Sequence, residues 1–324
     1  MYRMVVRELG GPASLEREEL AAVPADPGQV VIDVRATGCN FFDILITQGK
    51  YQVRPELPFS PGAEVAGTVR EVGRGVERFS LGDRVSALLE HGGFSSTVAS
   101  PQERVFPMPP GMTFEEAAAS GLVYQTSYVG LVHRANLQEG ETLLVHAAAG
   151  GVGLAAVQIG VALGAHVIGT AGTPDKLALV KQNGADVVIN YRDEDWVERV
   201  KELTDGRGAD VIYDPVGGDT FDLSTKCIAF EGRILVIGFA SGRIPSAKMN
   251  RVLVKNFSLV GLHWGLYFEK NPKVLQDAQE ALSRLYSAGK IAPVVSATYP
   301  LAEAKAALDA LGARKTTGKV VLIP

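Results

Sequence analysis

A cluster of glycines near the middle of the chain has the spacing of a phosphate-binding turn. Aligned on its last glycine it reads Ala148-x-Gly150-x-x-Gly153; an apolar run, Thr142 to His146, precedes it, and a helical pattern ending at Gly164 follows. Glycines let the backbone approach a pyrophosphate at a helix N-terminus, where free N–H groups and the helix dipole attract the anion. We therefore expect a dinucleotide to bind here. Its expected contacts are Ala149, Gly150, Gly151, Val152 and Gly153.

The end of the following strand selects the dinucleotide. An NAD site has an acidic residue about 20 residues after the glycines, where it binds the ribose hydroxyls. Here that position holds Ala171 or Gly172, and Lys176 lies in the first turn of the next predicted helix. Asp175 beside it is explained by the positive end of that helix. Without a carboxylate to repel a 2′-phosphate, the pattern predicts NADPH, with Gly172 and Lys176 at the phosphate.

The sequence offers few cysteines and histidines that could bind a metal ion. Cys39 and Cys227 are the only cysteines, so neither a disulfide framework nor a CxxC zinc site is expected. The five histidines show no ligand spacing, and we interpret them as structural or surface residues. They are His91, His133, His146, His166 and His263.

The elements that must position these residues follow two patterns. Up to about residue 120, alternating apolar runs at 29–35, 64–72 and 83–89 lie between turn signals. Such runs are typical of an irregular antiparallel sheet or barrel. From about residue 124, short continuous apolar runs alternate with helical stretches, which indicates a parallel sheet covered on both faces. These runs are 142–146, 165–170, 187–190, 210–213, 233–237 and 258–261.

The C-terminal part changes pattern again. It predicts a helix over 272–288, a strand over 294–298, a helix over 302–311 and a last strand over 319–323. That last strand is a candidate to return to the sheet of the first domain.

Composition bounds the class of protein. The 324 residues are 46% hydrophobic and 21% charged, as expected for about two globular domains. The formal net charge of −4 disfavours a nucleic-acid binder. No uncharged apolar run approaches about 18 residues, and the N-terminus lacks the apolar core of a signal peptide. We expect a soluble protein of the cytoplasm.

Several motifs in order make the chain resemble the medium-chain dehydrogenases/reductases, and within them the zinc-independent quinone oxidoreductases related to zeta-crystallin. The motifs are Gly38-Cys-Asn-Phe-Phe-Asp43, Gln48-Gly-Lys-Tyr51, Pro61-Gly-Ala-Glu-Val-Ala-Gly67, Gly82-Asp-Arg-Val85, Ala147-Ala-Ala-Gly-Gly-Val-Gly153 and Gly318-Lys-Val-Val-Leu-Ile-Pro324. The resemblance implies an α/β fold: a Rossmann doubly wound parallel sheet over 124–266, and a discontinuous GroES-like, mainly antiparallel β catalytic domain over 1–123 and 267–324. It also implies an active site in the cleft and a homodimer formed through Rossmann-domain edges.

The resemblance also implies that the zinc ligands of the zinc-dependent relatives are missing from this chain. Zinc-dependent relatives place a cysteine and a histidine where this chain has Asn40 and Ala63, and Cys39 is displaced by one residue. Without a metal to hold an alkoxide, the hydride acceptor should already be electrophilic. A quinone, or a C=C bond conjugated to a carbonyl, meets that requirement.

Two residues of the first domain match catalytic positions of the family. Tyr51 matches a tyrosine that donates a proton or hydrogen bond to the substrate; the alternative is a loop aromatic packed on Leu57 or Phe59. Asn40 matches an asparagine whose amide bonds the nicotinamide ribose or the substrate, or else it is a turn asparagine. Asp43 is interpreted as structural.

The resemblance implies further cofactor contacts. They are Thr126 and the backbone of Gly238 and Phe239 at the nicotinamide, and Tyr191 with Arg314 or Lys315 at the 2′-phosphate. His263, Trp264 and Tyr267 either wall the substrate cleft or face a subunit partner.

Three functions fit these expectations. The first is an NADPH-dependent quinone reductase, and the second is an NADPH-dependent reductase of enones or 2-enoyl-thioesters. The third is an NADPH-binding protein with a non-catalytic role. A complete glycine turn together with Asn40 and Tyr51 favours catalysis.

Overall fold

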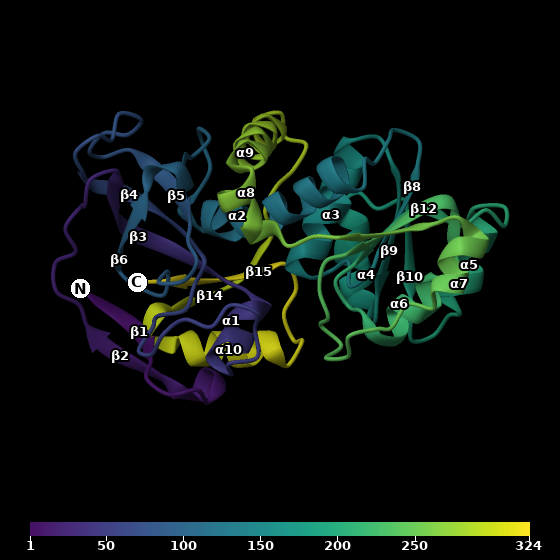
Figure 1. The fold of residues 1–324 in the computed structure, drawn as a ribbon, viewed down its shortest axis with the longest axis horizontal. Coiled ribbons are helices and arrows are strands. Elements are labelled where there is room, and N and C mark those ends of the chain that lie inside the picture. The colour runs from purple at the N-terminus through teal and green to yellow at the C-terminus, as the bar shows by residue number, and fades with distance from the viewer. The chain divides into compact units, whose positions relative to one another are not determined.

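The computed structural model describes residues 1–324 and divides them into two compact units. Unit 1 comprises residues 1–122 and 293–324, and unit 2 comprises residues 123–292 (Figure 1). The predicted return to the first domain at residue 267 is too early. Helix α9 (Pro272–Ser287) belongs to unit 2, because its Leu275 and Ala278 pack on Val129 in one buried cluster.

Unit 1 is built on a seven-stranded sheet, with six strands on one path and a seventh beside it. The path runs β14-β15-β3-β4-β5-β7, and β6 pairs with β3; only β14 and β15 pair in parallel. β1 and β2 form a separate antiparallel pair. The strands are β1 (Tyr2–Val6), β2 (Leu15–Glu19), β3 (Gln29–Cys39), β4 (Glu64–Val72), β5 (Arg84–Leu88), β6 (Thr97–Pro101), β7 (Val105–Pro107), β14 (Val295–Pro300) and β15 (Lys319–Ile323).

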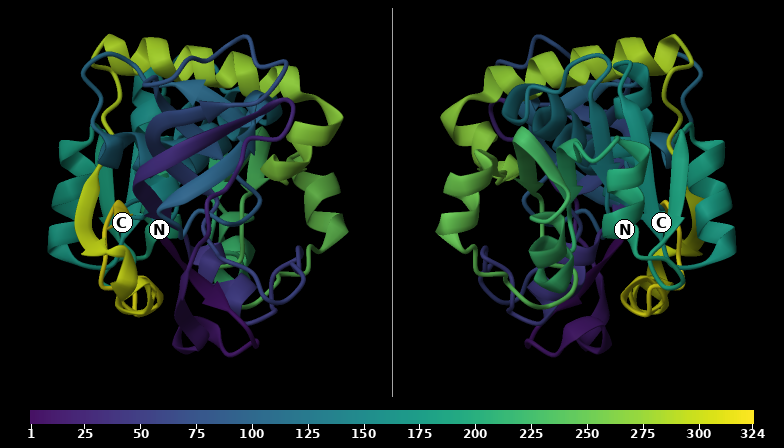
Figure 2. Two further views of the ribbon diagram at one scale, coloured as in Figure 1. Left: turned by 90° about the vertical axis from the view of Figure 1, so that its left-hand side faces the viewer. Right: turned by 90° about the vertical axis from the view of Figure 1, so that its right-hand side faces the viewer.

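The last strand returns to the first sheet, which confirms that expectation. β15 pairs antiparallel with β3, with Val320 opposite Cys39 and Leu322 opposite Thr37. The two chain ends lie side by side in this unit (Figures 1 and 2). Lys319 is thereby placed beside residues that precede it by some 280 positions.

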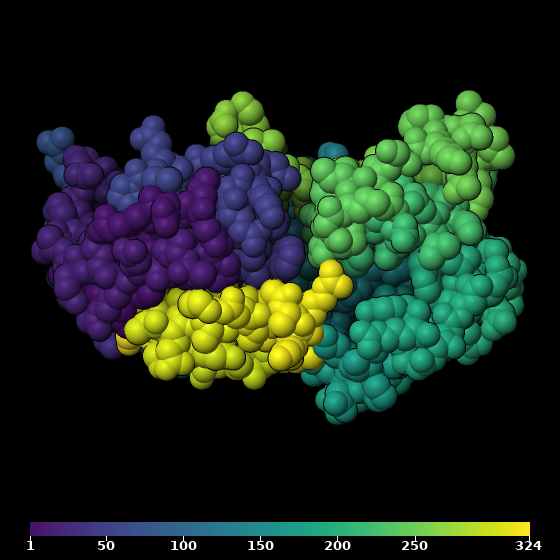
Figure 3. Space-filling view, turned by 90° about the horizontal axis from the view of Figure 1, so that it is seen from below, coloured from purple at the N-terminus to yellow at the C-terminus, as the bar shows by residue number.

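Helices α1 (Phe41–Thr47) and α10 (Ala304–Gly312) complete unit 1. Ile44 of α1 and Leu308 of α10 join one apolar core with Met4 of β1. Figure 3 shows the C-terminal segment, in yellow, lying against the purple N-terminal residues. This packing fixes the start of α1, where β3 ends.

Unit 2 is a parallel sheet of six strands in the order β10-β9-β8-β11-β12-β13. The strands are β8 (Thr142–Val145), β9 (His166–Ala171), β10 (Val187–Asn190), β11 (Ala209–Asp214), β12 (Ile228–Val236) and β13 (Ser258–Gly261). β8 is buried throughout, as in sheets covered on both faces. Figure 2, on the right, shows helices flanking the sheet. The predicted fold class of a Rossmann sheet plus an antiparallel β domain is confirmed.

The helices of unit 2 connect these strands. They are α3 (Gly151–Ala162), α4 (Pro174–Gln182), α5 (Trp196–Leu203), α6 (Gly218–Ser224), α7 (Met249–Lys255), α8 (Tyr267–Lys270) and α9. Helix α2 (Phe114–Tyr128) runs from unit 1 into unit 2 and continues as a π-helical turn. None of the helices combines the length and apolarity needed to cross a membrane.

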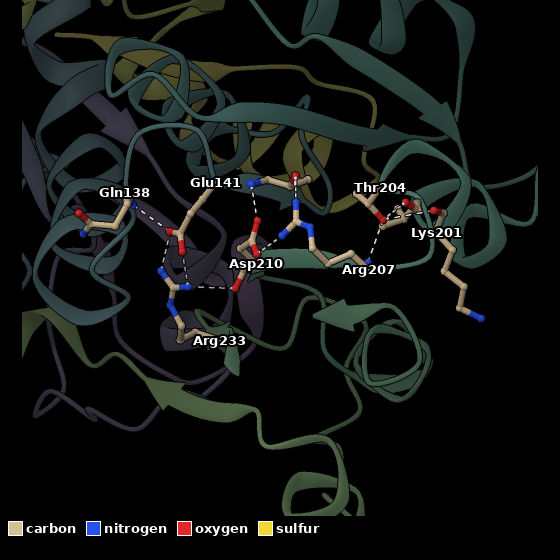
Figure 4. A network of polar contacts seen from close by, with 10 residues as sticks. Gln138, Glu141, Lys201, Thr204, Arg207, Asp210 and Arg233 are labelled. Atoms are coloured by element: carbon tan, nitrogen blue, oxygen red, sulfur yellow. Dashed lines mark hydrogen bonds and ion pairs between the residues drawn. The ribbon is translucent and has the colours of Figure 1, made fainter. Parts of the chain in front are cut away.

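A polar network joins the amino ends of three strands in unit 2. The Arg233 guanidinium of β12 donates to both carboxylate oxygens of Glu141, each at 2.7 Å, just before β8. Asp210 at the start of β11 accepts from the N–H of Thr142 at 2.7 Å (Figure 4). In a parallel sheet this edge is opposite the carboxyl ends of the strands, so the network stabilises the sheet away from the glycine turn.

Candidate active site

The glycine turn joins the first strand of the parallel sheet to helix α3. β8 ends at Val145, Gly150 is the N-cap of α3, and the helix begins at Gly151. A Cβ on Gly153 would lie 2.4 Å from the carbonyl oxygen of Ala147, so only glycine permits this approach of helix and strand. The N-terminus of α3 therefore offers its backbone N–H groups as a dinucleotide site requires.

Buried hydroxyl and imidazole groups hold this turn. Ser127 of α2 donates its hydroxyl hydrogen bond to the carbonyl oxygen of Val152 at 3.0 Å and lies 2.9 Å from the hydroxyl of Tyr213. His146 directly follows β8, and its two ring nitrogens lie 3.2 Å from the Thr170 hydroxyl and 2.9 Å from the Ser224 hydroxyl. Burial lowers the pKa of His146 to about 3, so its ring is neutral at physiological pH. The turn is supported without adding a protein charge beside the pyrophosphate position.

The residue after β9 lies against an aromatic and a cationic side chain. A Cβ on Gly172 would lie 2.6 Å from the Tyr191 hydroxyl oxygen and 3.0 Å from the Arg192 Nε. The structure thus brings Gly172 and Tyr191 together as expected, and adds Arg192, which the sequence reasoning missed. Its only signal was its position next to Tyr191. Lys176 lies in the first turn of α4, which Thr173 caps.

The remaining predicted contacts of unit 2 lie on two elements. Thr126 is buried on α2. Gly238 and Phe239 follow β12, and the Phe239 ring lies 2.9 Å from a Cβ built on Gly217. Because all strands are parallel, the segment after β12 lies at the same edge of the sheet as the glycine turn after β8.

The aromatic segment after β13 packs within its own unit. Trp264 lies edge-on to Phe268 with ring centroids 5.3 Å apart, and His133 lies edge-on to Tyr267 at 5.6 Å. Trp264 and Tyr267 both join the cluster that holds Val129 and α9. Both rings therefore have packing partners inside unit 2, and their role at the substrate cleft or at a subunit partner stays a prediction.

In unit 1, Asn40 lies between β3 and α1 in a buried polar cluster. Its Nδ2 donates to Glu64 Oε1 at 2.8 Å, and its Oδ1 accepts from the Lys319 ammonium at 2.6 Å. Lys319 and Glu64 form an ion pair at 2.7 Å, with side chains only 5% and 1% exposed. Glu64 and Lys319 lie in two of the motifs on which the family resemblance rests, but no local pattern indicated a role for either residue.

Asp43 closes the first turn of α1. Its carboxylate accepts from the backbone N–H of Asn40 at 2.7 Å and from that of Gly62 at 3.1 Å. Burial raises the pKa of Asp43 to about 7, although both backbone hydrogen bonds lower it. These contacts support its predicted structural role, since they join α1 to the turn before β4.

Tyr51 follows α1 and is partly buried. Its ring centroid lies 5.4 Å from that of Phe42, and the ring packs on the cluster that contains Ile46 and Phe59. Burial raises the pKa of the phenol, so the hydroxyl stays protonated at neutral pH. Packing on Phe59 was the structural alternative for Tyr51, and the protonated hydroxyl keeps the capacity to donate.

Arg314 and Lys315 follow α10 in unit 1 and are exposed. Arg314 adopts a left-handed backbone conformation with φ of 57°, which ends the helix. The predicted role of either residue at the 2′-phosphate stays a prediction.

A doubly wound sheet with a glycine turn after its first strand, in one chain with an antiparallel β domain, defines a dinucleotide-dependent dehydrogenase or reductase. Two family models match the chain. The alcohol dehydrogenase GroES-like domain matches residues 26–110, and the zinc-binding dehydrogenase matches residues 151–282.

Known relatives narrow the class. Quinone oxidoreductase-like protein 2 homolog of Nematostella vectensis is 43% identical over 325 residues, covering 99% of this chain and 88% of the relative. The crystal structure of Escherichia coli quinone oxidoreductase complexed with NADPH matches with a TM-score of 0.93 at 36% identity, covering 100% of both chains. The CurK enoyl reductase structure matches with a TM-score of 0.91 at 30% identity, covering 99% of this chain and 98% of that one. The chain belongs to the quinone oxidoreductase family of the medium-chain dehydrogenases/reductases.

One of the matching family models is named for zinc binding, but the residues of this chain do not fit a zinc site. No three His, Cys, Asp or Glu side chains are grouped to hold a metal ion. The Asn40 amide is engaged by Glu64 and Lys319, and the ammonium of Lys319 brings positive charge of its own. Cys39 lies in an apolar core, where burial raises the pKa of its thiol.

Proposed function

We propose that this protein is an NADPH-dependent reductase that transfers a hydride to a quinone without a metal. The choice of NADPH as the cofactor rests on one observation, that Gly172 lies against the side chains of Tyr191 and Arg192 beside the glycine turn. An acid at position 172 would repel a 2′-phosphate, whereas a guanidinium and a phenol hydroxyl can donate hydrogen bonds to it. Lys176, and Arg314 or Lys315, are proposed as further contacts to the same phosphate.

The chain's own residues have separate tasks in this proposal. The bound nicotinamide supplies the hydride. The N-terminus of α3 holds the pyrophosphate, and Thr126, Gly238 and Phe239 line the nicotinamide. Negative charge develops on the acceptor's carbonyl oxygen, and the Tyr51 hydroxyl, kept protonated by burial, donates a hydrogen bond to it. Asn40 contacts the cofactor.

The second candidate is reduction of a C=C bond conjugated to a carbonyl, in an enone or an enoyl-thioester. The whole-chain likeness to an enoyl reductase favours this candidate. The phenol of Tyr51 favours it too, because the enolate formed by hydride addition to an enone needs a proton donor, whereas the hydroquinone anion formed from a quinone can take its proton from water. The third candidate, an NADPH-binding protein without catalysis, requires binding without turnover.

One experiment separates the three candidates. NADPH oxidation is measured with quinones, simple enones and enoyl-thioesters, in the wild type, Tyr51→Phe and the control Tyr299→Phe, whose ring is also partly buried in unit 1. Quinone turnover supports our proposal. A preference for enones, with at least a tenfold loss in Tyr51→Phe alone, supports the second function. Tight NADPH binding with no oxidation supports the third, and full activity of Tyr51→Phe with every acceptor removes its donor role.

We also propose that two copies associate through the β13 edge of the parallel sheet. β13 is a terminal strand of that sheet, and several large apolar side chains of unit 2 are more than 60% exposed. They are Phe230, Ile244, Met249, Leu253 and Val254. An open strand edge and exposed apolar residues are both stabilised by association. Sedimentation velocity should show a dimer that Leu253→Glu dissociates and Leu81→Glu, an exposed leucine of unit 1, does not; a wild-type monomer contradicts the proposal.

Both cysteines are buried free thiols. Free thiols are typical of proteins in reducing compartments, so we place the protein in the cytoplasm.

A further inference from the structure

The first turn of helix α3 carries backbone N–H groups that the helix itself does not use. Its first hydrogen bond runs from the N–H of Leu154 to the carbonyl oxygen of Gly150 at 2.8 Å. The N–H groups of Gly151, Val152 and Gly153 come before that bond and are left for an anion. The Gly153 N–H belongs to the same planar peptide unit as the Val152 carbonyl. A contact that holds this carbonyl therefore also sets the direction of the Gly153 N–H.

A hydroxyl on another helix holds the Val152 carbonyl. Ser127 Oγ of α2 lies 3.0 Å from the Val152 carbonyl oxygen and 2.9 Å from the Tyr213 hydroxyl oxygen. The Ser127 hydroxyl has one proton, and the carbonyl can only accept. If Ser127 donated to Tyr213, two acceptor oxygens would face each other at 3.0 Å and the phenol proton would have no acceptor. The bonds therefore run from the Tyr213 hydroxyl to Ser127 and from the Ser127 hydroxyl to Val152.

This chain of hydrogen bonds is closed to water and lies within unit 2. The side chains of Ser127 and Tyr213 are both 0% exposed, and burial raises the pKa of the Tyr213 phenol, which keeps it protonated. Tyr213 on β11 pairs with Val145, the last residue of β8 before the glycine turn. A peptide carbonyl that accepts an additional hydrogen bond polarises its peptide unit, so the N–H of that unit becomes a stronger donor.

We propose that Ser127 and Tyr213 are positioning residues that aim and polarise the Gly153 N–H toward the pyrophosphate of the bound cofactor. This inference rests on the proposed function and deepens it. Ser127 supports the peptide unit directly, and Tyr213 acts through Ser127. NADPH and NADH share the pyrophosphate, so the pair supports the binding of both, unlike a contact to the 2′-phosphate.

Three ligands separate this role from a general one. Ser127→Ala removes the bond to Val152, and we expect the Kd values of NADPH and NADH each to rise about three- to tenfold, as for the loss of one hydrogen bond. Adenosine 2′-monophosphate has the 2′-phosphate but no pyrophosphate, so its Kd should stay constant. Tyr213→Phe keeps the bond from Ser127 to Val152, and its effect on the NADPH Kd should be smaller. Fluorescence titration measures the dinucleotides, and displacement of NADPH measures the monophosphate.

A double variant separates positioning from stability. In Ser127→Ala the buried Tyr213 hydroxyl loses its acceptor, which lowers the thermal midpoint. Adding Tyr213→Phe removes that unpaired hydroxyl, so the midpoint should rise again while the NADPH Kd stays as high as in Ser127→Ala. A double variant whose NADPH Kd returns to the wild-type value together with its midpoint overturns the proposal, because the weaker binding then came from lost stability.

Tyr124→Phe is the matched control. The Tyr124 hydroxyl donates to Gln158 Oε1 at 2.7 Å and so joins the same two helices, α2 and α3, beyond the first turn of α3. This variant should lower the thermal midpoint and leave all three Kd values unchanged. An unchanged NADPH Kd in Ser127→Ala, or an equal rise for adenosine 2′-monophosphate, refutes only the positioning role. A wild-type protein that binds neither dinucleotide refutes the proposed function itself.

Discussion

Replacing Arg192 by glutamine tests the phosphate site that the structure adds to the sequence prediction. The Nε of Arg192 lies 3.0 Å from a Cβ built on Gly172, so the guanidinium borders the position where the 2′-phosphate is expected. The backbone N–H of Arg192 donates to the Asn190 side chain at 3.1 Å, which fixes the residue at the end of β10. Arg192→Gln removes the charge and keeps most of the side-chain length.

The magnitude follows from one charged hydrogen bond at an exposed position. Such a bond contributes about 1.5–3 kcal/mol. Arg192 is exposed, and solvent and salt screening reduce the figure to about 1–2 kcal/mol. That range corresponds to a rise of about 5- to 30-fold in the NADPH Kd. NADH lacks the 2′-phosphate, so its Kd should change by less than about twofold.

Fluorescence titrations of NADPH and NADH at low and high salt measure this directly. The control is Arg199→Gln, an arginine of α5 that pairs with Glu202 at 2.9 Å. The NADPH effect should shrink as salt rises, because the interaction is exposed. Equal losses of NADPH and NADH affinity, or no loss at all, would refute the assignment of Arg192 to the phosphate.

Two further predictions test the framework of the cofactor site. In Gly153→Ala the new Cβ would lie 2.4 Å from the backbone carbonyl oxygen of Ala147, so we expect the free energy of unfolding to fall by about 1–3 kcal/mol and NADPH to bind at least tenfold more weakly. The control is Gly265→Ala, where no atom lies within 4 Å of the new Cβ. Matching NADPH titration curves for the two variants would contradict the close approach of helix and strand. His146 has a folded-state pKa of about 3, below its unfolded value, so between about pH 6.5 and 3 the unfolded state binds a proton that the folded state does not, and stability falls as pH falls. His146→Gln removes this pH dependence. Between pH 7.5 and pH 5, urea unfolding should show the free energy of unfolding of the wild type falling by about 2 kcal/mol more than that of the variant. Equal decreases in the two proteins would exclude a buried neutral imidazole.

The amino-acid sequence alone determined the parts of this protein that depend on local spacing. The glycine turn could be predicted because its function needs small residues at fixed intervals between a strand and a helix, and residues 148–153 have them in that context. The preference for NADPH followed from the missing acid at Gly172. Period-two and continuous apolar runs likewise predicted an antiparallel and a parallel sheet, because side-chain burial follows backbone geometry.

Contacts between distant segments were decided only by the tertiary structure. Glu64 and Lys319 are separated by 255 residues and meet because β15 pairs with β3, a pairing that no local pattern specifies. The domain boundary at residue 292 depends on α9 packing against Val129, and an amphipathic helix does not encode which surface it covers. Arg192 lies beside Gly172 because β10 is next to β9 in the sheet, which brings the segment after one strand close to the residue after the other. The spacing of residues in the sequence determines which turns and strands can form, whereas the pairing of distant strands determines which charged side chains lie next to them.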